Sequence, residues 1–471
     1  MKTIAFHNLG CKVNSYETDV MVQKCAEKGY EIVDFEQKAD IYIVNTCSVT
    51  NIADRKSRQM LHKAKKTNPD SIVVAVGCFV QANPEEVAKD EAIDLIVGNN
   101  KKKDIVEILD KYLAEKEANA IKNNSCNETD ILKDKDLHGE TVEDLRHCDY
   151  EEIKVFGSTE RCRVFVKIQD GCDRYCTYCI IPYTRGNIRS RRKEDIIEEI
   201  KGIASNGYKE VVLTGIHVSS YGKDFEIAKG ASKADNLEKS AEYLYDLINE
   251  AAGIDGIERI RIGSFEPMIL SEDFVKKLSG IKKLCPHFHI SLQSGSDTVL
   301  KRMNRHYNTD EYYDKTVLLR KYFPGCAITT DVIAGFPGET EEEFEETYRY
   351  LEKIKFFETH IFPYSRRKGT IADRMDGQLT QAAKKERVSR LMELDARESA
   401  EFRKSKLGET TDIIVEETKE IGGKVYYVGH TPEYIMVAIE ENKLHNDCIG
   451  QKLKIALKSM LNDQIVLAEV V

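Results

Sequence analysis

The chain of 471 residues contains no tryptophan, few prolines and no long apolar run. The missing tryptophan excludes nothing. Because no window holds the roughly 18 consecutive apolar residues of a membrane span, the sequence argues against a transmembrane helix. The chain has only 9 prolines and 28 glycines, and these low numbers exclude the collagen-like and broadly disordered classes of protein. Residues 1–17 contain neither an apolar signal core nor a small-residue cleavage site, so we expect a cytoplasmic protein.

The sequence also lacks two nucleotide-binding motifs and an excess of positive charge. Neither a P-loop nor a G-x-G-x-x-G fingerprint occurs, so nucleotide hydrolysis and Rossmann dinucleotide chemistry have no support. The formal net charge of −10 excludes a uniformly basic nucleic-acid coat but leaves room for local basic patches. With 41% hydrophobic and 32% charged residues, the composition is typical of a globular protein, and the length predicts several domains.

Hydrophobic patterning predicts a mixed α/β chain in several parts. Strand-like and helical segments alternate in the first hundred residues and again, six times, between residues 163 and 365. Five short strand-like runs follow residue 407. We therefore predict an open parallel α/β domain at 1–114, an acidic linker at 115–160, a partial (βα)6 barrel at 161–378, a helical connector at 379–407 and a small β-barrel at 408–471.

Thirteen cysteines are the most informative part of the composition. In a reducing cytosol a framework of disulfides is not expected, and the odd number argues against complete pairing. Metal-binding or catalytic thiolates are therefore the leading interpretation. His217, His287 and His289 lie on or beside predicted strands, where we expect packing in the core or in a pocket rather than metal binding.

The strongest local motif is the C-x3-C-x2-C spacing of Cys172, Cys176 and Cys179, directly after the first predicted barrel strand. Three thiolates on one short loop can each bind one iron of a [4Fe–4S] cluster. The fourth iron then has no protein ligand and can chelate the amino and carboxylate groups of S-adenosylmethionine. Structural zinc is the alternative, although such sites usually have four protein ligands. Structural cysteines without a metal are the least expected case at the carboxyl end of a barrel strand, where active sites lie.

This loop on a partial barrel resembles the radical S-adenosylmethionine (SAM) superfamily. The resemblance implies that electron transfer cleaves SAM to a 5′-deoxyadenosyl radical, which abstracts a hydrogen atom from the substrate. It also implies that SAM binds along the carboxyl ends of the barrel strands. The residues expected there are Tyr178, Thr214, Gly215, Ser264, Gln293, Val332 and Gly335.

Three further cysteines, Cys11, Cys47 and Cys78, each follow one of the predicted strands of the first domain. Because ligands bind outside the carboxyl ends of parallel strands, the three thiols are expected near one edge of the sheet. Their spacing alone does not decide between a shared metal site and independent cysteines.

Together with the segments around them, 8–14, 45–47 and 77–78, these cysteines resemble the amino-terminal domain of the methylthiotransferases. The resemblance covers the whole chain. It implies a second [4Fe–4S] cluster on Cys11, Cys47 and Cys78, and a carboxyl-terminal barrel of the TRAM type. Segments 167–172, 213–217 and 362–370 most resemble the branch that acts on N6-threonylcarbamoyladenosine (t6A) in tRNA.

The resemblance implies conversion of t6A, the adenosine 3′ to the anticodon, to 2-methylthio-t6A. The cofactors would be two [4Fe–4S] clusters and SAM, the six cysteines would be catalytic, and a reduced protein such as flavodoxin or ferredoxin would supply electrons. The identity of the sulfur donor stays open. The same chemistry on N6-isopentenyladenosine tRNA or on a ribosomal protein is an alternative, as is a non-catalytic iron–sulfur sensor that binds RNA.

Basic clusters predict where tRNA binds, since phosphate contacts position RNA without reading its sequence. One cluster lies at residues 184–193 and another within 361–406, although the part from 384 onwards is equally compatible with a solvated helix. The segment 411–471 is acidic, which is unexpected for a TRAM domain that grips RNA. The side chains expected to contact RNA are Arg185, Arg189, Arg191, Arg192, Arg366, Arg367 and Lys368.

Overall fold

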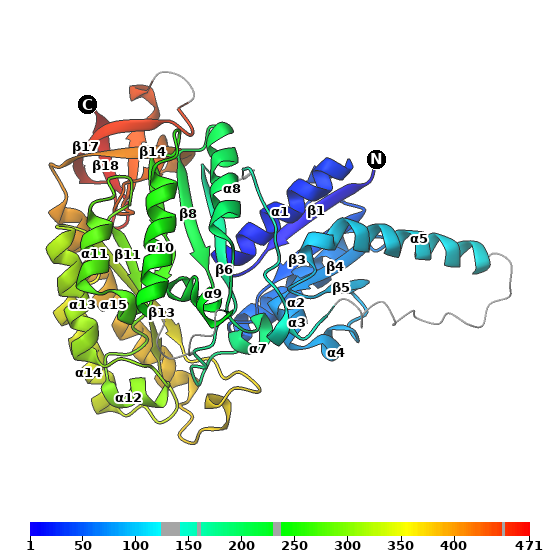
Figure 1. Cartoon of the computed structure of the whole chain (residues 1–471), viewed down its shortest axis with the longest axis horizontal. Helices are drawn as coiled ribbons and strands as arrows, with labels where there is room; N and C mark the ends of the chain where they lie inside the picture. Colours follow the sequence, from blue (N-terminus) through cyan, green and yellow to red (C-terminus); the bar gives the residue numbers. More distant parts are fainter. Residues whose placement is uncertain (124–141, 158–161, 229–236, 445–447) are drawn as a thin grey trace. The chain divides into compact units, whose positions relative to one another are not determined.

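The computed structural model describes residues 1–123, 142–157, 162–228, 237–444 and 448–471 (Figure 1). Contacts divide the chain into two compact units. The first unit contains residues 1–155, 170–174 and 179–189, and the second contains 156–169, 175–178 and 190–471. No helix in the described ranges is long and apolar enough to cross a membrane.

The first unit is built on a parallel sheet of five strands in the order β2-β1-β3-β4-β5. Every residue of β3 and β4 is buried, as expected for central strands that helices cover on both faces. One apolar core lies between the sheet and α2, and the other between the sheet and α1 with α5. The elements are β1 (Thr3–Asn8), α1 (Lys12–Lys28), β2 (Glu31–Val33), β3 (Ile41–Thr46), α2 (Asn51–Thr67), β4 (Ile72–Gly77), α3 (Cys78–Ala82), α4 (Pro84–Val87), β5 (Leu95–Val97) and α5 (Ile105–Asn123).

The acidic segment predicted as a linker at 115–160 is structured in much of its described part. Helix α5 continues to Asn123, nine residues past the predicted boundary at 114. Residues 142–155 pack on the first unit: the Tyr16 hydroxyl donates to the carbonyl of Ile153 at 2.6 Å, and the Gln81 amide donates to the carbonyl of Glu143 at 2.7 Å. The remaining residues of the predicted linker, 124–141 and 158–161, lie outside the described residues.

The second unit contains two four-stranded sheets, β7-β6-β8-β9 and β10-β11-β12-β13. The pairs β6-β8 and β8-β9 in the first sheet, and every pair in the second, are parallel. The six predicted barrel strands are all present, and the third is divided at Gly263 into β9 and β10. The strands are β6 (Arg163–Asp170), β7 (Arg189–Ser190), β8 (Glu210–Gly215), β9 (Arg259–Ile262), β10 (Ser264–Phe265), β11 (His287–Ile290), β12 (Ala327–Ala334) and β13 (Glu358–Pro363). The main helices that connect them are α8 (Lys193–Ser205), α10 (Leu237–Ala252), α11 (Glu272–Ser279), α12 (Asp297–Arg302), α13 (Thr309–Tyr322) and α14 (Glu341–Ile354).

A long helix and a closed barrel complete the second unit. Helix α15 (Gln381–Ser405) packs on β13 and leads into a five-stranded barrel with the strand order β14-β15-β16-β18-β17. This confirms the small carboxyl-terminal β-barrel. Its strands are β14 (Thr410–Ile421), β15 (Lys424–His430), β16 (Met436–Glu440), β17 (Lys452–Met460) and β18 (Val466–Val470).

Acidic side chains of the small barrel pair with arginines at the amino-terminal ends of the βα strands. Asp412 of β14 pairs with Arg259 of β9, and Glu416 lies 3.2 Å from Arg163 of β6. The Tyr434 ring of the same barrel lies against Arg163 and stacks on His287, with 5.0 Å between the ring centroids. Part of the negative charge of segment 411–471 is therefore used inside the protein, to fix the small barrel to the larger one.

Candidate functional site

The three cysteines of the first unit lie at the carboxyl ends of adjacent strands. Cys11 precedes α1 just after β1, Cys47 follows β3, and Cys78 follows β4 as the first residue of α3. The strand register pairs Asn8 with Asn45 and Thr46 with Gly77, so these strand ends lie side by side. The order β1-β3-β4 thus brings three thiols from distant parts of the sequence to one edge of the sheet.

Two glycines allow the backbone to pass close to these cysteines. Gly10 has φ +105°, and a Cβ atom there would lie 2.8 Å from the Cys47 sulfur. Gly77 has φ +99°, and a Cβ atom there would lie 2.6 Å from both the Asn45 side-chain oxygen and the Thr46 carbonyl oxygen. Any larger residue would push the strand ends apart, so both positions require glycine.

The environment of the thiols fits metal ligands better than free nucleophiles. Burial, with the neighbouring Cys78 as the next contribution, raises the pKa of Cys47 to about 12. A free thiol of this kind stays protonated near neutral pH, whereas coordination to a metal deprotonates a thiol outright. A set of three cysteines at one sheet edge fits a [4Fe–4S] cluster with one iron not bound by the protein.

A buried arginine lies directly beside this cysteine set. The Nε of Arg185 donates to the Cys78 sulfur at 3.4 Å, and Asn99 donates to the same sulfur at 3.5 Å. Both guanidinium nitrogens of Arg185 donate to Glu17, at 2.6 and 3.0 Å, and one also donates to Asn14 at 2.6 Å. The site therefore holds a fixed positive charge against a ligand sulfur. The sequence does not predict this role, because residues 78 and 185 are far apart in the chain and share no local motif.

The loop that carries Cys172, Cys176 and Cys179 is shared between the two units. Within the first unit, the Cys172 amide donates to the carbonyl of Gly186 at 3.0 Å. Within the second unit, Arg305 donates to the Cys176 sulfur at 3.2 Å and pairs with Glu266 at 2.5 Å. Each cysteine set thus has a ligand sulfur that accepts a hydrogen bond from a buried arginine, and each arginine is held by a buried glutamate. The donor sets fit two iron–sulfur clusters, since second-shell hydrogen bonds to sulfur are typical of such centres.

The residues expected to contact SAM lie in the second unit at the carboxyl ends of its strands. Gln293 has φ +72°, and its backbone bonds to Asp331 and Ile333 of β12 at 2.8 and 2.9 Å. The Gly335 amide donates to Glu339 at 2.7 Å, and Tyr178 packs edge-on against Phe336. The remaining four lie at the ends of β8 (Thr214, Gly215), at the start of β10 (Ser264) and within β12 (Val332). Their contacts with SAM stay a prediction.

The predicted RNA contacts fall into two groups. Arg185 and Arg191 are fully buried and paired with Glu17 and Glu199, and Arg189 is buried with its Nη1 donating to the Leu145 carbonyl at 3.1 Å. Phosphate contacts by these three stay a prediction, and they are weaker candidates because their side chains are buried and each has a partner inside the protein.

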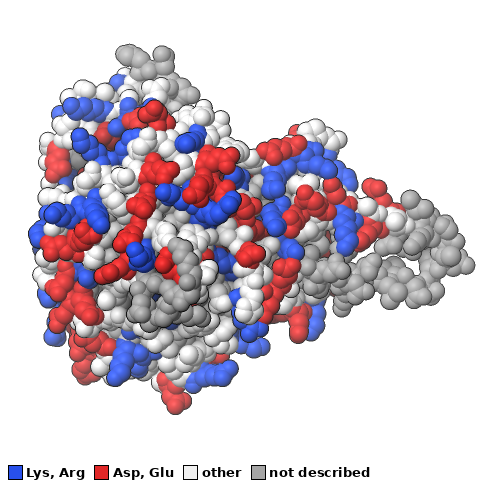
Figure 2. Space-filling model, in the orientation of Figure 1, with Lys and Arg blue, Asp and Glu red and all other residues white. Residues whose placement is uncertain are grey.

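The second group is more accessible. Arg192, Arg366 and Lys368 are exposed, whereas Arg367 is 5% exposed. On the face drawn in Figure 2, Lys and Arg side chains are interspersed with Asp and Glu. RNA contacts by the exposed side chains stay a prediction, and the buried Arg367 is a weaker candidate.

Comparisons with known proteins agree with this arrangement. Residues 166–351 match the Radical SAM superfamily, and residues 3–98 match the uncharacterized protein family UPF0004. The chain is 40% identical over 462 residues to the threonylcarbamoyladenosine tRNA methylthiotransferase MtaB of Bacillus subtilis, covering 97% of this chain and 94% of that protein. It is also 40% identical to MtaB of Aquifex aeolicus, over 88% of this chain and 93% of the relative. A tRNA-2-methylthio-N(6)-dimethylallyladenosine synthase of Acetivibrio thermocellus is 34% identical, over 90% of this chain and 83% of the relative. The chain therefore belongs to the radical SAM methylthiotransferase family.

Proposed function

We propose that this protein converts t6A in tRNA to 2-methylthio-t6A. The observation that carries the proposal is the 40% identity, over nearly the full length of both chains, to a relative named for this reaction. The relative named for the dimethylallyladenosine reaction is 34% identical. The two cysteine sets support the chemistry, because the reaction requires both a radical and a source of sulfur.

The reaction must replace the hydrogen on carbon 2 of adenine, which is aromatic and unactivated. When bound, the two clusters and SAM supply the carbon radical that removes this hydrogen and the methylthio group that replaces it. Cys172, Cys176 and Cys179 would hold the cluster that binds SAM. Cys11, Cys47 and Cys78 would hold the other cluster.

The chain's own charged side chains position these groups. Arg185 and Arg305 each offset negative charge on a ligand sulfur while remaining fixed by a glutamate. Exposed cations, among them Arg192, Arg366 and Lys368, attract the tRNA backbone. A reduced flavodoxin or ferredoxin is the proposed electron donor, and the cytoplasm the proposed compartment.

Single cysteine variants of the reconstituted, anaerobically reduced protein test the division of roles. Cys176→Ala should abolish both SAM cleavage and thiolation, whereas Cys47→Ala should retain SAM cleavage and lose thiolation. Cys148→Ser, at a cysteine outside both sets, should behave as the wild type. Unchanged thiolation in Cys47→Ala would refute the role of the first set.

A further inference from the structure

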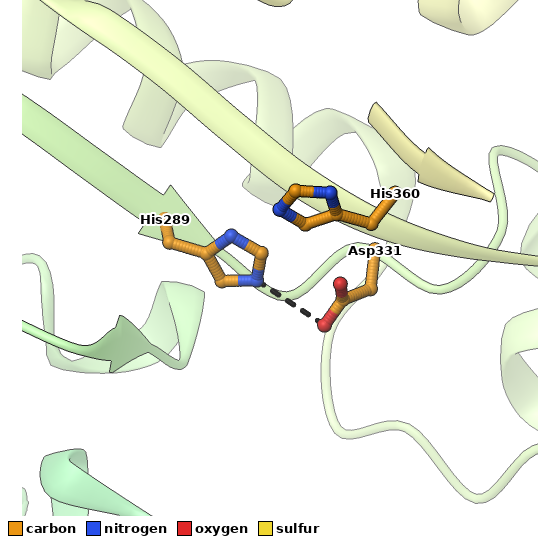
Figure 3. Close-up of side chains that lie close together, drawn as sticks. All are labelled: His289, Asp331 and His360. Carbon is orange, nitrogen blue, oxygen red and sulfur yellow. Dashed lines mark hydrogen bonds and ion pairs between the residues drawn. The ribbon is translucent and has the colours of Figure 1, made fainter. Parts of the chain in front are cut away.

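Three polar side chains of the second unit lie on one face of neighbouring strands (Figure 3). They are His289 of β11, Asp331 of β12 and His360 of β13, whose ligand atoms all lie within 4.8 Å of one another. The strand register places His289 beside Thr329, and Asp331 beside His360. Of these three residues, the sequence points only to His289, for which we expect packing in the core or in a pocket.

Alternation along the strands shows which face these residues occupy. Thr330, next to Asp331 in β12, accepts a hydrogen bond from Tyr312 of α13 at 3.3 Å. Phe288, next to His289 in β11, packs on Phe323 at the end of the same helix. Because successive side chains of a strand point to opposite faces, His289 and Asp331 point away from the helices, towards the inner face of the βα sheet.

Hydrogen bonds hold the first imidazole in a defined state. The Nε2 of His289 lies 3.2 Å from an Asp331 carboxylate oxygen, and its Nδ1 lies 3.1 Å from the Thr329 hydroxyl. An ionised carboxylate only accepts, so Nε2 donates to Asp331. The second imidazole, of His360, stacks on the first at 5.6 Å between ring centroids.

The cluster is open to a ligand. The Asp331 side chain is 31% exposed, and His360 is exposed. His360 also lines a cavity of about 760 Å³ formed by residues of β13, α15 and the small barrel, within the usual size range of ligand pockets. The cluster thus presents one carboxylate acceptor and, in His360, an imidazole that borders a cavity large enough for the polar end of a modified base.

We propose that His289, Asp331 and His360 form the subsite that recognises the threonylcarbamoyl group of t6A. This inference rests on the proposed function. The group carries a carboxylate, a hydroxyl and urea N–H donors. The imidazole of His360 suits the carboxylate, Asp331 accepts from the hydroxyl or urea donors, and His289 holds Asp331 in place.

The same cluster rejects an isopentenyl group. A hydrocarbon would bury the carboxylate and the imidazoles without replacing their hydrogen bonds to water, which is costly. Sites built to hydrogen-bond a polar substituent discriminate strongly against analogues that lack it. The three residues therefore account for a choice between two substrates on which the same chemistry operates.

Binding of two matched tRNAs to the full-length reconstituted protein tests the subsite. One tRNA carries t6A and the other carries unmodified adenosine at the same position. The wild type should prefer the t6A form by at least about tenfold, the range expected for hydrogen bonds to charged groups. In His360→Ala and in Asp331→Asn the preference should fall towards one, and the KM for t6A tRNA should rise more than kcat falls.

A matched control is available in the first unit. His62 is an exposed histidine that pairs with Asp90 at 2.8 Å, so His62→Gln removes a similar pair elsewhere and should keep the wild-type preference. Because His360 is exposed, His360→Ala carries the test if Asp331→Asn fails to fold.

Three results would overturn the proposal. The first is a folded variant in which both affinities, and so the preference, are unchanged. The second is a folded variant in which both tRNAs bind equally more weakly, so that the preference is again unchanged and the role is structural. The third is a divalent ion, detected by metal analysis beyond the cluster iron, that the wild type retains and both variants lose. That result would make the cluster a metal site.

Discussion

Replacing Arg185 by methionine tests the buried charge network beside Cys78. The guanidinium donates to both oxygens of Glu17, and it lies 3.3 Å from Asp170. Without it, Glu17 keeps Lys102 as a charged partner, and Asp170 keeps Arg189 at 3.7 Å. Removing one partner of a buried ion pair costs about 3–5 kcal/mol. At about 2–4 °C per kcal/mol for a unit of this size, Tm should fall by roughly 6–20 °C.

The same substitution should change the electronic properties of the site. Arg185 places a positive charge and an N–H donor on the Cys78 sulfur, and both favour the more negative, reduced state of a bound cluster. We expect Arg185→Met to shift the reduction potential of the first cluster to more negative values in an EPR-monitored titration, while Arg185→Lys retains part of the wild-type value.

Arg192→Gln is the control for this experiment, since Arg192 is exposed and pairs with Asp195, three residues further along the chain. It should leave both Tm and potential unchanged. A Tm within about 1 °C of the wild type in Arg185→Met, together with an unchanged potential at full iron content, would refute the reasoning.

Three further predictions concern the second unit. Burial raises the pKa of Glu398 to about 7, so the folded state binds this proton more tightly than the unfolded chain, and stability falls as the pH rises from about 4 to 7. Glu398→Gln should flatten that part of the thermal-denaturation profile, and a profile parallel to the wild type would contradict the assignment. Arg259→Ala, which removes the pair with Asp412, should lower Tm and expose the junction of the two barrels to limited proteolysis; an unchanged cleavage pattern would count against that junction. Affinity for tRNA should fall steeply with salt, and replacing Arg366 and Lys368 by glutamine should reduce the slope of log K against log salt; an unchanged slope would remove them from the interface.

Long, strongly patterned elements could be predicted from the sequence, and very short ones could not. The central strands β3 and β4 are largely apolar runs, so their positions could be predicted from the pattern of apolar residues in the sequence. The strands β2 and β5 have three residues each and owe their existence to pairing with β1 and β4. Helix α5 extends past its apolar face, and no proline or glycine marks its end.

The cysteines could be found from sequence because their spacing and their place after strands are local signals. The role of Arg185 could not, since it depends on Glu17, which lies 168 residues away. In the sequence, Arg185, Arg189 and Arg191 form one basic cluster, but folding buries all three. The role of the acidic residues in segment 411–471 also could not be predicted from the sequence. Asp412 and Glu416 form ion pairs with arginines of the larger barrel, and those arginines are distant in sequence.

The most direct test of the account is nucleoside mass spectrometry of tRNA from a host that lacks its own methylthiotransferases, with and without expression of this chain. We predict that 2-methylthio-t6A appears only when the chain is expressed, and that it is absent when Cys47 or Cys176 is replaced by alanine. Appearance of the 2-methylthio derivative of isopentenyladenosine instead, with t6A left unmodified, would contradict both the proposed substrate and the polar subsite.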